Sequence, residues 1–458
     1  MGKDSIQINE SSRVDMTEDY RLVVLGLGYV GLTLAGVYAQ AGFKTVGVDI
    51  NKNIISNLKK GVPHFHENGL PELLEATKDN LSSSTTIDGE DKSKNSIYVI
   101  AVGTSLDKDG NADYSQIDQS AKDISGSLKK GDVVILRSTV VVGTTKKRVL
   151  ATIEETTKLK EGEDFYVGFA PERTVEGKAI QELRTLPQVI ASNSDKGTNL
   201  IRDFFEKVSE EVVVVDSIES AEMVKLISNA YRDLSFSFAN SVALAAYEHN
   251  VDVDDLIGAA NHGYERNRIP LPSPGVGGYC LTKDPYLFAF SSPSVPDLMD
   301  LMSVGRKIND SMPNHVVSIT TDFIQAKGLV DPSITIVGLA FKSDPITSDI
   351  RFSPSIDVID LLKKAGHTKL SGFDPYVTDE VFAEQEIERV SDLSEVSTNS
   401  DIIIFMHGGN RYRDENLVKN MKNSARELLL VDTWSLYRKD FNSDDKITYT
   451  NLSYNSQK

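Results

Sequence analysis

The chain has 458 residues, a formal charge of −18 at pH 7 and a hydrophobic share of 40%. This length exceeds what a single hydrophobic core serves, so about three domains are expected. No apolar run approaches the ~20 residues that cross a bilayer, and the net negative charge argues against nucleic acid as a partner. One cysteine and no apolar signal-like segment at the N-terminus favour a cytoplasmic protein with no membrane partner.

A strand, a glycine-rich turn and a helix open the first folded segment. Apolar residues at 21–25 predict the strand, and helical spacing at 32–40 predicts the helix. Between them lie the residues that we expect to form the cofactor site, with the pyrophosphate at the helix N-terminus: Gly26, Gly28, Tyr29, Val30 and Gly31. A second strand at 45–48 ends in Asp49, whose carboxylate would accept the ribose hydroxyls and repel a 2′-phosphate. The pattern favours NAD over NADP, and an unoccupied doubly wound sheet is the alternative.

Three more strands are predicted in this segment, at 97–102, 133–136 and 165–170. Thr104 follows the first strand, Ser138 and Thr139 follow the second, and Glu172 and Arg173 follow the third. Ligands collect at the carboxyl ends of strands in open α/β sheets, so we expect Thr104, Ser138 and Thr139 at the cofactor. Glu172 and Arg173 are candidates for acid–base chemistry and anion contact, or else form a surface ion pair.

A long helix is predicted over 217–249, where Ala, Leu, Val and Phe are frequent and helix breakers are few. Glu222, Lys225 and Asn229 lie at i, i+3 and i+7, which places them on one face. An exposed face explains such spacing without any function. The alternative is a helix that lines a cleft, where Lys225 and Asn229 donate hydrogen bonds to a developing oxyanion. The helix is also long enough to join two domains and to carry a dimer contact.

Cys280 is the only cysteine, and it lies in the run PGVGGYCLTKD at 274–284. A free cysteine is most often a buried structural residue. Glycines, however, allow the backbone to approach a ligand closely. The nearby ammonium of Lys283 favours the thiolate, which is the form that attacks carbon. The loop therefore predicts a nucleophile rather than an inert core residue.

A second series of strands follows at 334–337, 370–373, 401–405 and 428–431, with a helix at 356–364. Alternating strands and helices predict a second parallel sheet. The expected fold is α/β, with two doubly wound Rossmann-like domains joined by a central helical domain with a long connecting helix. The expected segments are a disordered tail at 1–20, an NAD-binding domain at 21–214, a helical dimerisation domain with the cysteine loop at 215–312, and a C-terminal domain at 313–458.

An NAD site together with a thiol that traps an aldehyde indicates two successive oxidations, from alcohol to aldehyde and from thiohemiacetal to thioester. The chain resembles the UDP-glucose/GDP-mannose dehydrogenase family over residues 21–433. The motifs that carry this resemblance are GLGYVG at 26–31, STV at 138–140, PER at 171–173, Lys225 with Asn229, GVGGYC at 275–280, and GLAFKSD at 338–344 followed by Arg351.

The resemblance implies that the chain oxidises C6 of a nucleotide sugar to a carboxylate with two NAD. It implies that Cys280 is the nucleophile, that Lys225 with Asn229 stabilises the oxyanion, and that Glu172 is the base for thioester hydrolysis. Asp284 would assist proton transfer or orient Lys225.

Further roles follow from the same resemblance. Thr139 would position water, and no metal ion is implied. The residues implied to bind the UDP-sugar are Arg173, Lys225, Asn229, Arg266, Gly277, Lys342 and Arg351. Arg266 resembles a residue that reaches the substrate of a neighbouring subunit, which implies a homodimer with a loop contributed across the interface.

The identity of the sugar depends on short stretches around these motifs. PER at 171–173 and GVGG at 275–278 resemble the branch that oxidises UDP-N-acetylmannosamine or UDP-N-acetylglucosamine. Tyr279 stands where that branch usually has His, Lys283 resembles the UDP-glucose branch, and Trp434 stands where some relatives have a substrate-binding Arg. UDP-N-acetylmannosamine is favoured. The alternatives are a UDP-glucose 6-dehydrogenase, a two-electron hydroxyacid or alcohol dehydrogenase, and a catalytically silent sensor of NAD or a nucleotide sugar.

Overall fold

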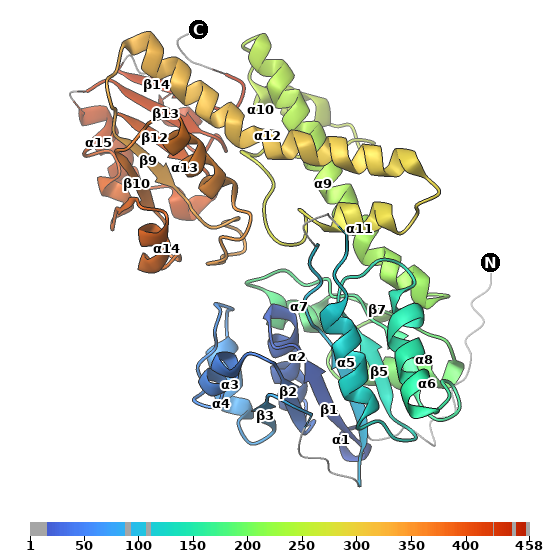
Figure 1. Cartoon of the computed structure of the whole chain (residues 1–458). Helices are drawn as coiled ribbons and strands as arrows, with labels where there is room; N and C mark the ends of the chain where they lie inside the picture. The colour runs from blue at the N-terminus through green and yellow to red at the C-terminus, as the bar shows by residue number, and fades with distance from the viewer. Residues whose placement is uncertain (1–15, 88–92, 107–110, 425, 442–445, 455–458) are drawn as a thin grey trace. The chain divides into compact units, whose positions relative to one another are not determined.

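The computed structural model describes residues 16–87, 93–106, 111–424, 426–441 and 446–454 (Figure 1). It divides the chain into two compact units, at residues 1–225 and 226–458. Each unit has its own sheet, mostly parallel in the first unit and parallel in the second, with helices on both faces. The predicted α/β fold with two Rossmann-like domains is therefore confirmed.

The first unit is built on an eight-stranded sheet with the order β3-β2-β1-β4-β5-β6-β7-β8. Its strands are β1 (Tyr20–Leu25), β2 (Thr45–Val48), β3 (Leu81–Ser84), β4 (Asn95–Ile100), β5 (Val133–Leu136), β6 (Tyr166–Phe169), β7 (Gln188–Ser192) and β8 (Val212–Val214). The strands from β3 to β6 are parallel, in the doubly wound order, and β7 runs antiparallel to β6. The predicted strands all form, whereas β3, β7 and β8 were not predicted.

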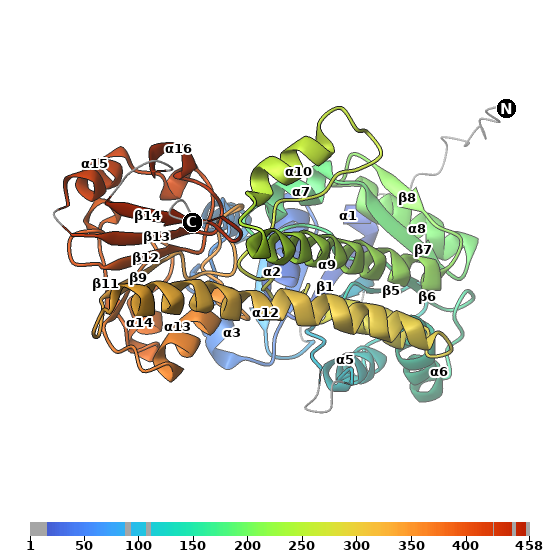
Figure 2. The ribbon, with the colours of Figure 1, turned by 90° about the horizontal axis from the view of Figure 1, so that it is seen from above.

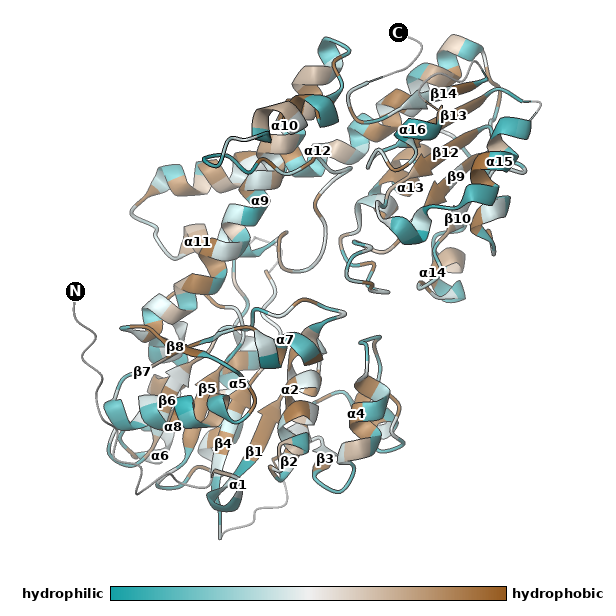
Figure 3. Cartoon of the chain, turned by 180° about the vertical axis from the view of Figure 1, so that it is seen from behind, coloured by the Kyte–Doolittle hydropathy of each residue, from teal (hydrophilic) through white to brown (hydrophobic). Residues whose placement is uncertain are grey.

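Helices cover both faces of this sheet because successive strand residues point to opposite sides. The helices are α1 (Met16–Asp19), α2 (Tyr29–Gln40), α3 (Lys52–Leu58), α4 (Leu70–Thr77), α5 (Ser115–Ser125), the π-helix η2 (Thr145–Leu150), α6 (Ala151–Thr157), α7 (Ala179–Thr185) and α8 (Asp195–Glu206). Val24 and Ile135 pack with α2 and α8, whereas Val23 and Leu136 pack with α5 and α6. Figure 3 shows the strands as apolar and the helices as mixed.

The N-terminal boundary differs from the expectation. Residues 16–20 were assigned to a disordered tail, but Met16–Asp19 form α1 and Tyr20 begins β1. Met16 is fully buried in the core of the first unit, because α1 packs its one apolar side chain against the strand that follows. Residues 1–15 of the predicted tail lie outside the described residues.

The second unit contains the helices that follow the first sheet. They are α9 (Ile218–Glu248), which begins in the first unit, α10 (Val253–Asn261), α11 (Asp284–Phe290) and α12 (Pro296–Lys327). Asp233 and Asn240 of α9 bond to Arg306 and Asn309 of α12, so the two helices lie side by side (Figure 2). The predicted helix at 217–249 corresponds closely to α9.

The second sheet has six parallel strands with the order β11-β10-β9-β12-β13-β14. Its elements are β9 (Ile334–Val337), α13 (Pro354–Lys364), β10 (Leu370–Phe373), α14 (Asp379–Glu384), β11 (Glu388–Arg389), the short helix η3 (Leu393–Glu395), β12 (Ile402–Phe405), the short helix η4 (Asn410–Tyr412), α15 (Glu415–Asn423), β13 (Leu428–Asp432), α16 (Arg438–Phe441) and β14 (Ile447–Thr450). This order places the first and fourth strands, β9 and β12, side by side at the centre. It repeats the doubly wound order of the first unit.

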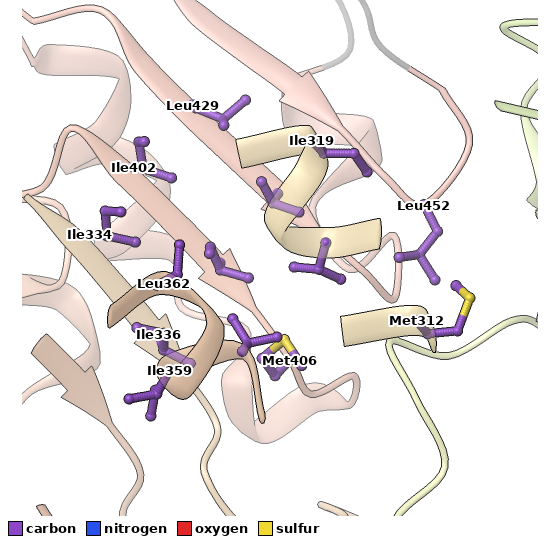
Figure 4. Close-up of a cluster of buried hydrophobic side chains, with 14 of the residues drawn as sticks. Met312, Ile319, Ile334, Ile336, Ile359, Leu362, Ile402, Met406, Leu429 and Leu452 are labelled. Atoms are coloured by element: carbon purple, nitrogen blue, oxygen red, sulfur yellow. The ribbon is translucent and has the colours of Figure 1, made fainter. Parts of the chain in front are cut away.

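Helix α12 belongs to the core of the second sheet. Met312 and Ile319 of α12 are buried in one cluster with Ile336 of β9, Leu362 of α13 and Leu429 of β13 (Figure 4). The expected domain boundary at 312/313 therefore falls inside a continuous helix. Pro313 lies within this helix without ending it, and Gly328 ends it in a left-handed conformation with φ of 63°.

Candidate functional site

The glycine turn after β1 leaves open space at the N-terminus of α2. Gly26 has φ of +90°, which disfavours other residues, and a Cβ on Gly31 would lie 1.8 Å from the Gly26 carbonyl oxygen. Gly28 is the N-cap of α2, no side chain caps it, and a Cβ there would meet nothing within 4 Å. Backbone N–H groups at an uncapped helix N-terminus bind phosphates, so this turn fits the pyrophosphate of NAD.

Asp49 is fixed at the carboxyl end of β2, beside the glycine turn. Its Oδ2 accepts a hydrogen bond of 2.9 Å from the backbone N–H of Leu27, and its Oδ1 accepts one of 2.8 Å from Asn51. Each carboxylate oxygen accepts more than one hydrogen bond. Both oxygens can therefore still accept ribose hydroxyls while the backbone holds the carboxylate in place.

The residues predicted after β4 and β5 are brought together. Thr104 is buried and its hydroxyl donates to the backbone oxygen of Thr139 at 2.5 Å. The hydroxyl of Ser138 donates to the backbone oxygen of Val102 at 2.7 Å. These bonds join the two loops at the carboxyl edge of adjacent strands, which is where the doubly wound fold binds its cofactor.

Glu172 forms a buried ion pair with Arg137. The Arg137 side chain has no exposure, and its nitrogen atoms reach Oε2 of Glu172 at 2.7 and 2.9 Å. Oε1 accepts hydrogen bonds from the backbone N–H groups of Arg173 and Thr174 at 2.7 and 2.6 Å. Burial by itself would raise the pKa of Glu172, but the charges of Arg137 and Lys225 and the bond from Thr174 lower it below its usual value. The carboxylate is therefore ionised and held in one orientation.

The cysteine loop is neither helix nor strand, and Cys280 is exposed within it. Exposure excludes the structural alternative of an inert core cysteine. The glycines before it pack tightly: a Cβ on Gly277 would lie 2.1 Å from the backbone oxygen of Phe352, and one on Gly278, at φ of +84°, would lie 2.6 Å from the Phe341 ring. Close packing is therefore a second reason for a glycine at position 277, in addition to its expected role in substrate binding.

Asp284 is fully buried at the start of α11, between two donors. Its Oδ2 accepts a hydrogen bond of 2.5 Å from the Asn229 amide, and its Oδ1 accepts one of 2.7 Å from the Lys283 ammonium. Burial would lower the pKa of Lys283, but the charges of Asp284 and Cys280 raise it overall. Lys283 therefore remains protonated near Cys280, which favours the thiolate.

Tyr279 lies close to two cations of the second unit. The Lys283 ammonium and the Arg351 guanidinium each lie 5.1 Å from the centre of its ring, within the range of cation–π attraction. Arg351 also binds the carboxylate of Asp349 through two nitrogen atoms, at 2.5 and 2.9 Å. The predicted substrate ligand Arg351 is thus held beside the cysteine loop by Asp349 and Tyr279.

The remaining polar residues that the sequence singled out are partly exposed and partly buried. Arg173 and Arg266 are exposed, and Arg266 stacks over Tyr264 at 5.0 Å. The ammonium of Lys342 lies 5.4 Å from the centre of the Phe341 ring. Glu222 is buried and accepts hydrogen bonds from the backbone N–H groups of Gly143 and Thr145.

Sequence reasoning missed Arg137 and Asp349, the partners of two predicted residues. Arg137 directly precedes Ser138 at the end of β5, so its place at a strand end was visible, but its partner 35 residues away was not. Asp349 lies two residues before Arg351 and carried no recognisable signal. Within the described part of the chain, no helix is long and apolar enough to cross a membrane.

Three sequence models of one family match the chain in order. The NAD binding domain of the UDP-glucose/GDP-mannose dehydrogenase family matches residues 20–209, its central domain matches 219–311, and its UDP binding domain matches 335–439. These matches cover most of both units.

Individual proteins agree with the family match. A UDP-N-acetyl-D-mannosamine dehydrogenase from Pyrococcus horikoshii is 34% identical over 363 residues, which are 78% of this chain and 84% of that protein. A solved UDP-D-ManNAc dehydrogenase from the same organism superposes with a TM-score of 0.81 at 27% identity, covering 94% of this chain and 99% of that one. A UDP-glucose dehydrogenase from Pyrobaculum islandicum superposes with a TM-score of 0.80 at 26% identity, covering 97% and 100%.

Proposed function

Because the chain belongs to the UDP-glucose/GDP-mannose dehydrogenase family, we propose that it oxidises C6 of a UDP-N-acetylhexosamine to the carboxylate through a covalent intermediate on Cys280. UDP-N-acetyl-D-mannosamine is the favoured substrate. NAD, when bound, accepts the hydride of each oxidation. The observation that carries the covalent step is the exposed Cys280 beside the buried, protonated Lys283.

The proposed reaction balances as one alcohol, two NAD⁺ and one water giving one carboxylate, two NADH and three protons. Loss of the C6 hydroxyl proton and of a hydride gives the aldehyde. The Cys280 sulfur then bonds to C6, and the aldehyde oxygen becomes the oxyanion of a thiohemiacetal. Loss of a second hydride from C6 leaves a thioester. Water adds to its carbonyl, the carbon–sulfur bond breaks, and the acid and the thiolate separate.

The residues of each unit supply different parts of this chemistry. In the first unit, the ionised Glu172 is the proposed base for thioester hydrolysis, and Thr139 is proposed to position the water. Lys225 and Asn229 are proposed to stabilise the oxyanion. In the second unit, Asp284 orients the Asn229 amide through the 2.5 Å hydrogen bond between them.

The choice of an acetylated amino sugar rests on the relative that is 34% identical, which is a UDP-N-acetyl-D-mannosamine dehydrogenase. The motifs at 171–173 and 275–278 support the same branch. UDP-glucose is the second candidate, because the buried Lys283–Asp284 pair matches that branch and a UDP-glucose dehydrogenase superposes almost equally well.

A substrate panel tests the proposed reaction. NADH release is measured for UDP-N-acetylmannosamine, UDP-N-acetylglucosamine, UDP-glucose and GDP-mannose, together with the acid formed. We expect two NADH per molecule of UDP-N-acetylmannosamine. One NADH per sugar would indicate the two-electron dehydrogenase instead. Binding without any NADH formation would indicate a sensor, and activity with UDP-glucose alone would overturn the choice of sugar.

Cys280→Ala tests the covalent step separately. The variant is expected to stop at the aldehyde, because the second oxidation then lacks a nucleophile. A carbonyl-trapping reagent should capture that aldehyde, and thermal melting with and without NAD should show that the fold and the cofactor site persist. Full acid production by the variant would refute the covalent mechanism and leave the family assignment intact.

The same proposal includes a homodimer in which Arg266 acts on the substrate of the partner chain. Large apolar side chains are exposed on both long helices of the second unit, among them Tyr231 and Phe238 on α9 and Leu301 and Val304 on α12, each more than half exposed. Exposed apolar patches of this kind support an interface between subunits. Arg266 itself is exposed on the loop after α10.

A further inference from the structure

A buried arginine contacts the cysteine loop on both sides of Cys280. Arg306 lies on α12, and its side chain is only 2% exposed. Its guanidinium donates a hydrogen bond of 3.1 Å to the backbone oxygen of Val276 and makes a longer contact of 3.5 Å with that of Leu281. Val276 precedes Cys280 by four residues, and Leu281 follows it directly. One rigid side chain thus holds the backbone before and after the thiol.

Arg306 is itself fixed by acidic and amide groups of both long helices. Oδ1 of Asp233, on α9, accepts a hydrogen bond of 2.6 Å from Arg306, and Asp310, one turn further along α12, pairs with the same guanidinium. Asn309 donates at 2.9 Å to the same oxygen of Asp233. A planar guanidinium bound at several points has little freedom to rotate.

The same network reaches the start of the loop. The Asn240 amide donates to Oδ1 of Asn309 at 2.9 Å, and Oδ1 of Asn240 accepts a hydrogen bond of 2.8 Å from the backbone N–H of Ser273. Asp233, Asn240 and Asn309 are all fully buried. The loop is therefore bound to α9 and α12 near its beginning, at its middle and just after Cys280.

The segment that leads into α13 also packs against the loop. The Phe341 ring packs on Gly278, and the backbone oxygen of Phe352 packs on Gly277. The loop is thus held both by hydrogen bonds to Arg306 and by close van der Waals contact. A buried ion pair adds little net stability compared with apolar packing of the same volume, so its main effect here is to fix geometry.

We propose that Arg306 is a positioning residue that holds the backbone on either side of Cys280, so that the thiolate meets the C6 aldehyde in the attacking geometry. The inference rests on the proposed covalent role of Cys280. Its effect is confined to steps in which sulfur reacts, because the hydrogen bonds of the Arg306 side chain within the described part of the chain go to the loop backbone and to Asp233 and Asp310. The first oxidation, which does not use the thiol, is affected much less.

Arg306→Lys tests this proposal, because lysine keeps the charge beside Asp233 but lacks the second arm that contacts the loop carbonyls. The rate of acid formation from the supplied aldehyde is expected to fall by about 100-fold, the order of effect of a ~1 Å misplacement of a reacting group. The KM for the UDP-sugar should stay within about threefold of wild type, since uniform binding is unchanged. Iodoacetamide alkylates Cys280, the only thiol of the chain. The rate of this alkylation in Arg306→Lys should also differ from the rate in the wild type.

Arg438→Met is the matched control. Arg438 forms a bidentate ion pair with Asp255 in the same unit, at 2.5 and 2.9 Å, and lies outside the network around the cysteine loop. This variant should keep the wild-type ratio of the two oxidation rates. Arg306→Met serves as a second test variant, and its melting temperature shows whether any loss of activity follows from unfolding.

The outcomes separate the inference from the proposed function. If Cys280→Ala stops at the aldehyde but Arg306→Lys oxidises the aldehyde at the wild-type rate, the positioning role is wrong and the covalent mechanism stands. If both oxidations fall equally in Arg306→Lys, Arg306 has only a structural role and the inference is also wrong. If Cys280→Ala makes acid normally, the proposed function itself fails.

Discussion

At the scale of single residues, the ion pair with Arg137 determines the protonation state of Glu172. Its place at the end of a strand predicted either an acid–base group or a surface ion pair. Glu172 does form an ion pair, but the pair is buried and its partner is Arg137 rather than Arg173. A carboxylate with a lowered pKa acts as a base over a wide pH range, because it stays ionised at lower pH than usual.

Arg137→Met should make acid production more sensitive to low pH. Without the guanidinium, burial dominates and raises the pKa of Glu172, so the base is lost by protonation at a higher pH than in the wild type. The acidic limb of the pH–rate profile for acid formation should therefore move to higher pH. An acidic limb at the wild-type position would contradict the role of Glu172 as the base.

The same substitution should also destabilise the first unit. Removing one partner of a buried ion pair typically costs about 3–5 kcal/mol, which urea denaturation can measure. Arg137→Lys keeps the charge and provides a milder variant in case Arg137→Met does not fold. Arg148→Met is the control: its ion pair with Asp118 is about 40% exposed on the Arg148 side, so the expected loss is only about 0–1 kcal/mol.

At the scale of elements, a buried carboxylate ties β4 to β5. Asp132 directly precedes β5, has no exposure, and accepts hydrogen bonds from the backbone N–H groups of Ser96 at 2.7 Å and Lys129 at 2.9 Å. Burial raises the pKa of Asp132 to about 6, although both bonds act against the rise. The folded protein therefore binds a proton at Asp132 that the unfolded chain releases near pH 4.

This difference predicts a specific pH dependence of stability. Between about pH 4 and pH 6 the folded state holds more protons at Asp132 than the unfolded state, so its contribution to the free energy of unfolding falls as the pH rises through that range. The fall should be of the order of 3 kcal/mol for a shift of about two pKa units. The asparagine side chain of the Asp132→Asn variant cannot ionise, so this variant should lack the fall in the free energy of unfolding.

Urea denaturation of wild type and Asp132→Asn at several pH values measures this effect. The stability of the wild type relative to the variant should be larger at pH 4 than at pH 7. A difference between the two proteins that is independent of pH would show that Asp132 titrates alike in the folded and unfolded states.

At the scale of the whole molecule, the proposed dimer decides whether one chain carries a complete site. Arg266 is exposed and has no contact with the cysteine loop among the interactions of the described residues. If Arg266 acts on the partner's substrate, two inactive chains can complement each other. A net charge of −18 on each chain makes assembly sensitive to salt, so subunit exchange is best carried out at moderate ionic strength.

Mixing Cys280→Ala with Arg266→Ala provides the test. A mixed dimer combines the intact cysteine of one chain with the intact Arg266 of the other, so one of its two sites is complete. After exchange of equal amounts, about a quarter of the wild-type activity should appear, since half of the dimers are mixed and each has one working site. Light scattering measures the mass of the protein and shows whether it is a dimer. No recovery with a dimeric mass would place Arg266 in its own chain's site, and a monomeric mass would refute the dimer.

The sequence by itself determined the features that short stretches specify. The strand, glycine turn and helix between residues 21 and 40, most strands of the two sheets and the glycine-rich loop around Cys280 were predicted, because hydrophobic periodicity and glycine positions are local properties. The strands β3, β7, β8, β11 and β14 were not predicted. Only the tertiary structure decided which groups meet. Arg137 and Glu172 are 35 residues apart, Asn229 and Asp284 are 55 apart, and Asp233 and Arg306 are 73 apart. Such contacts depend on the path of the whole chain and on burial that excludes water, neither of which a local pattern encodes.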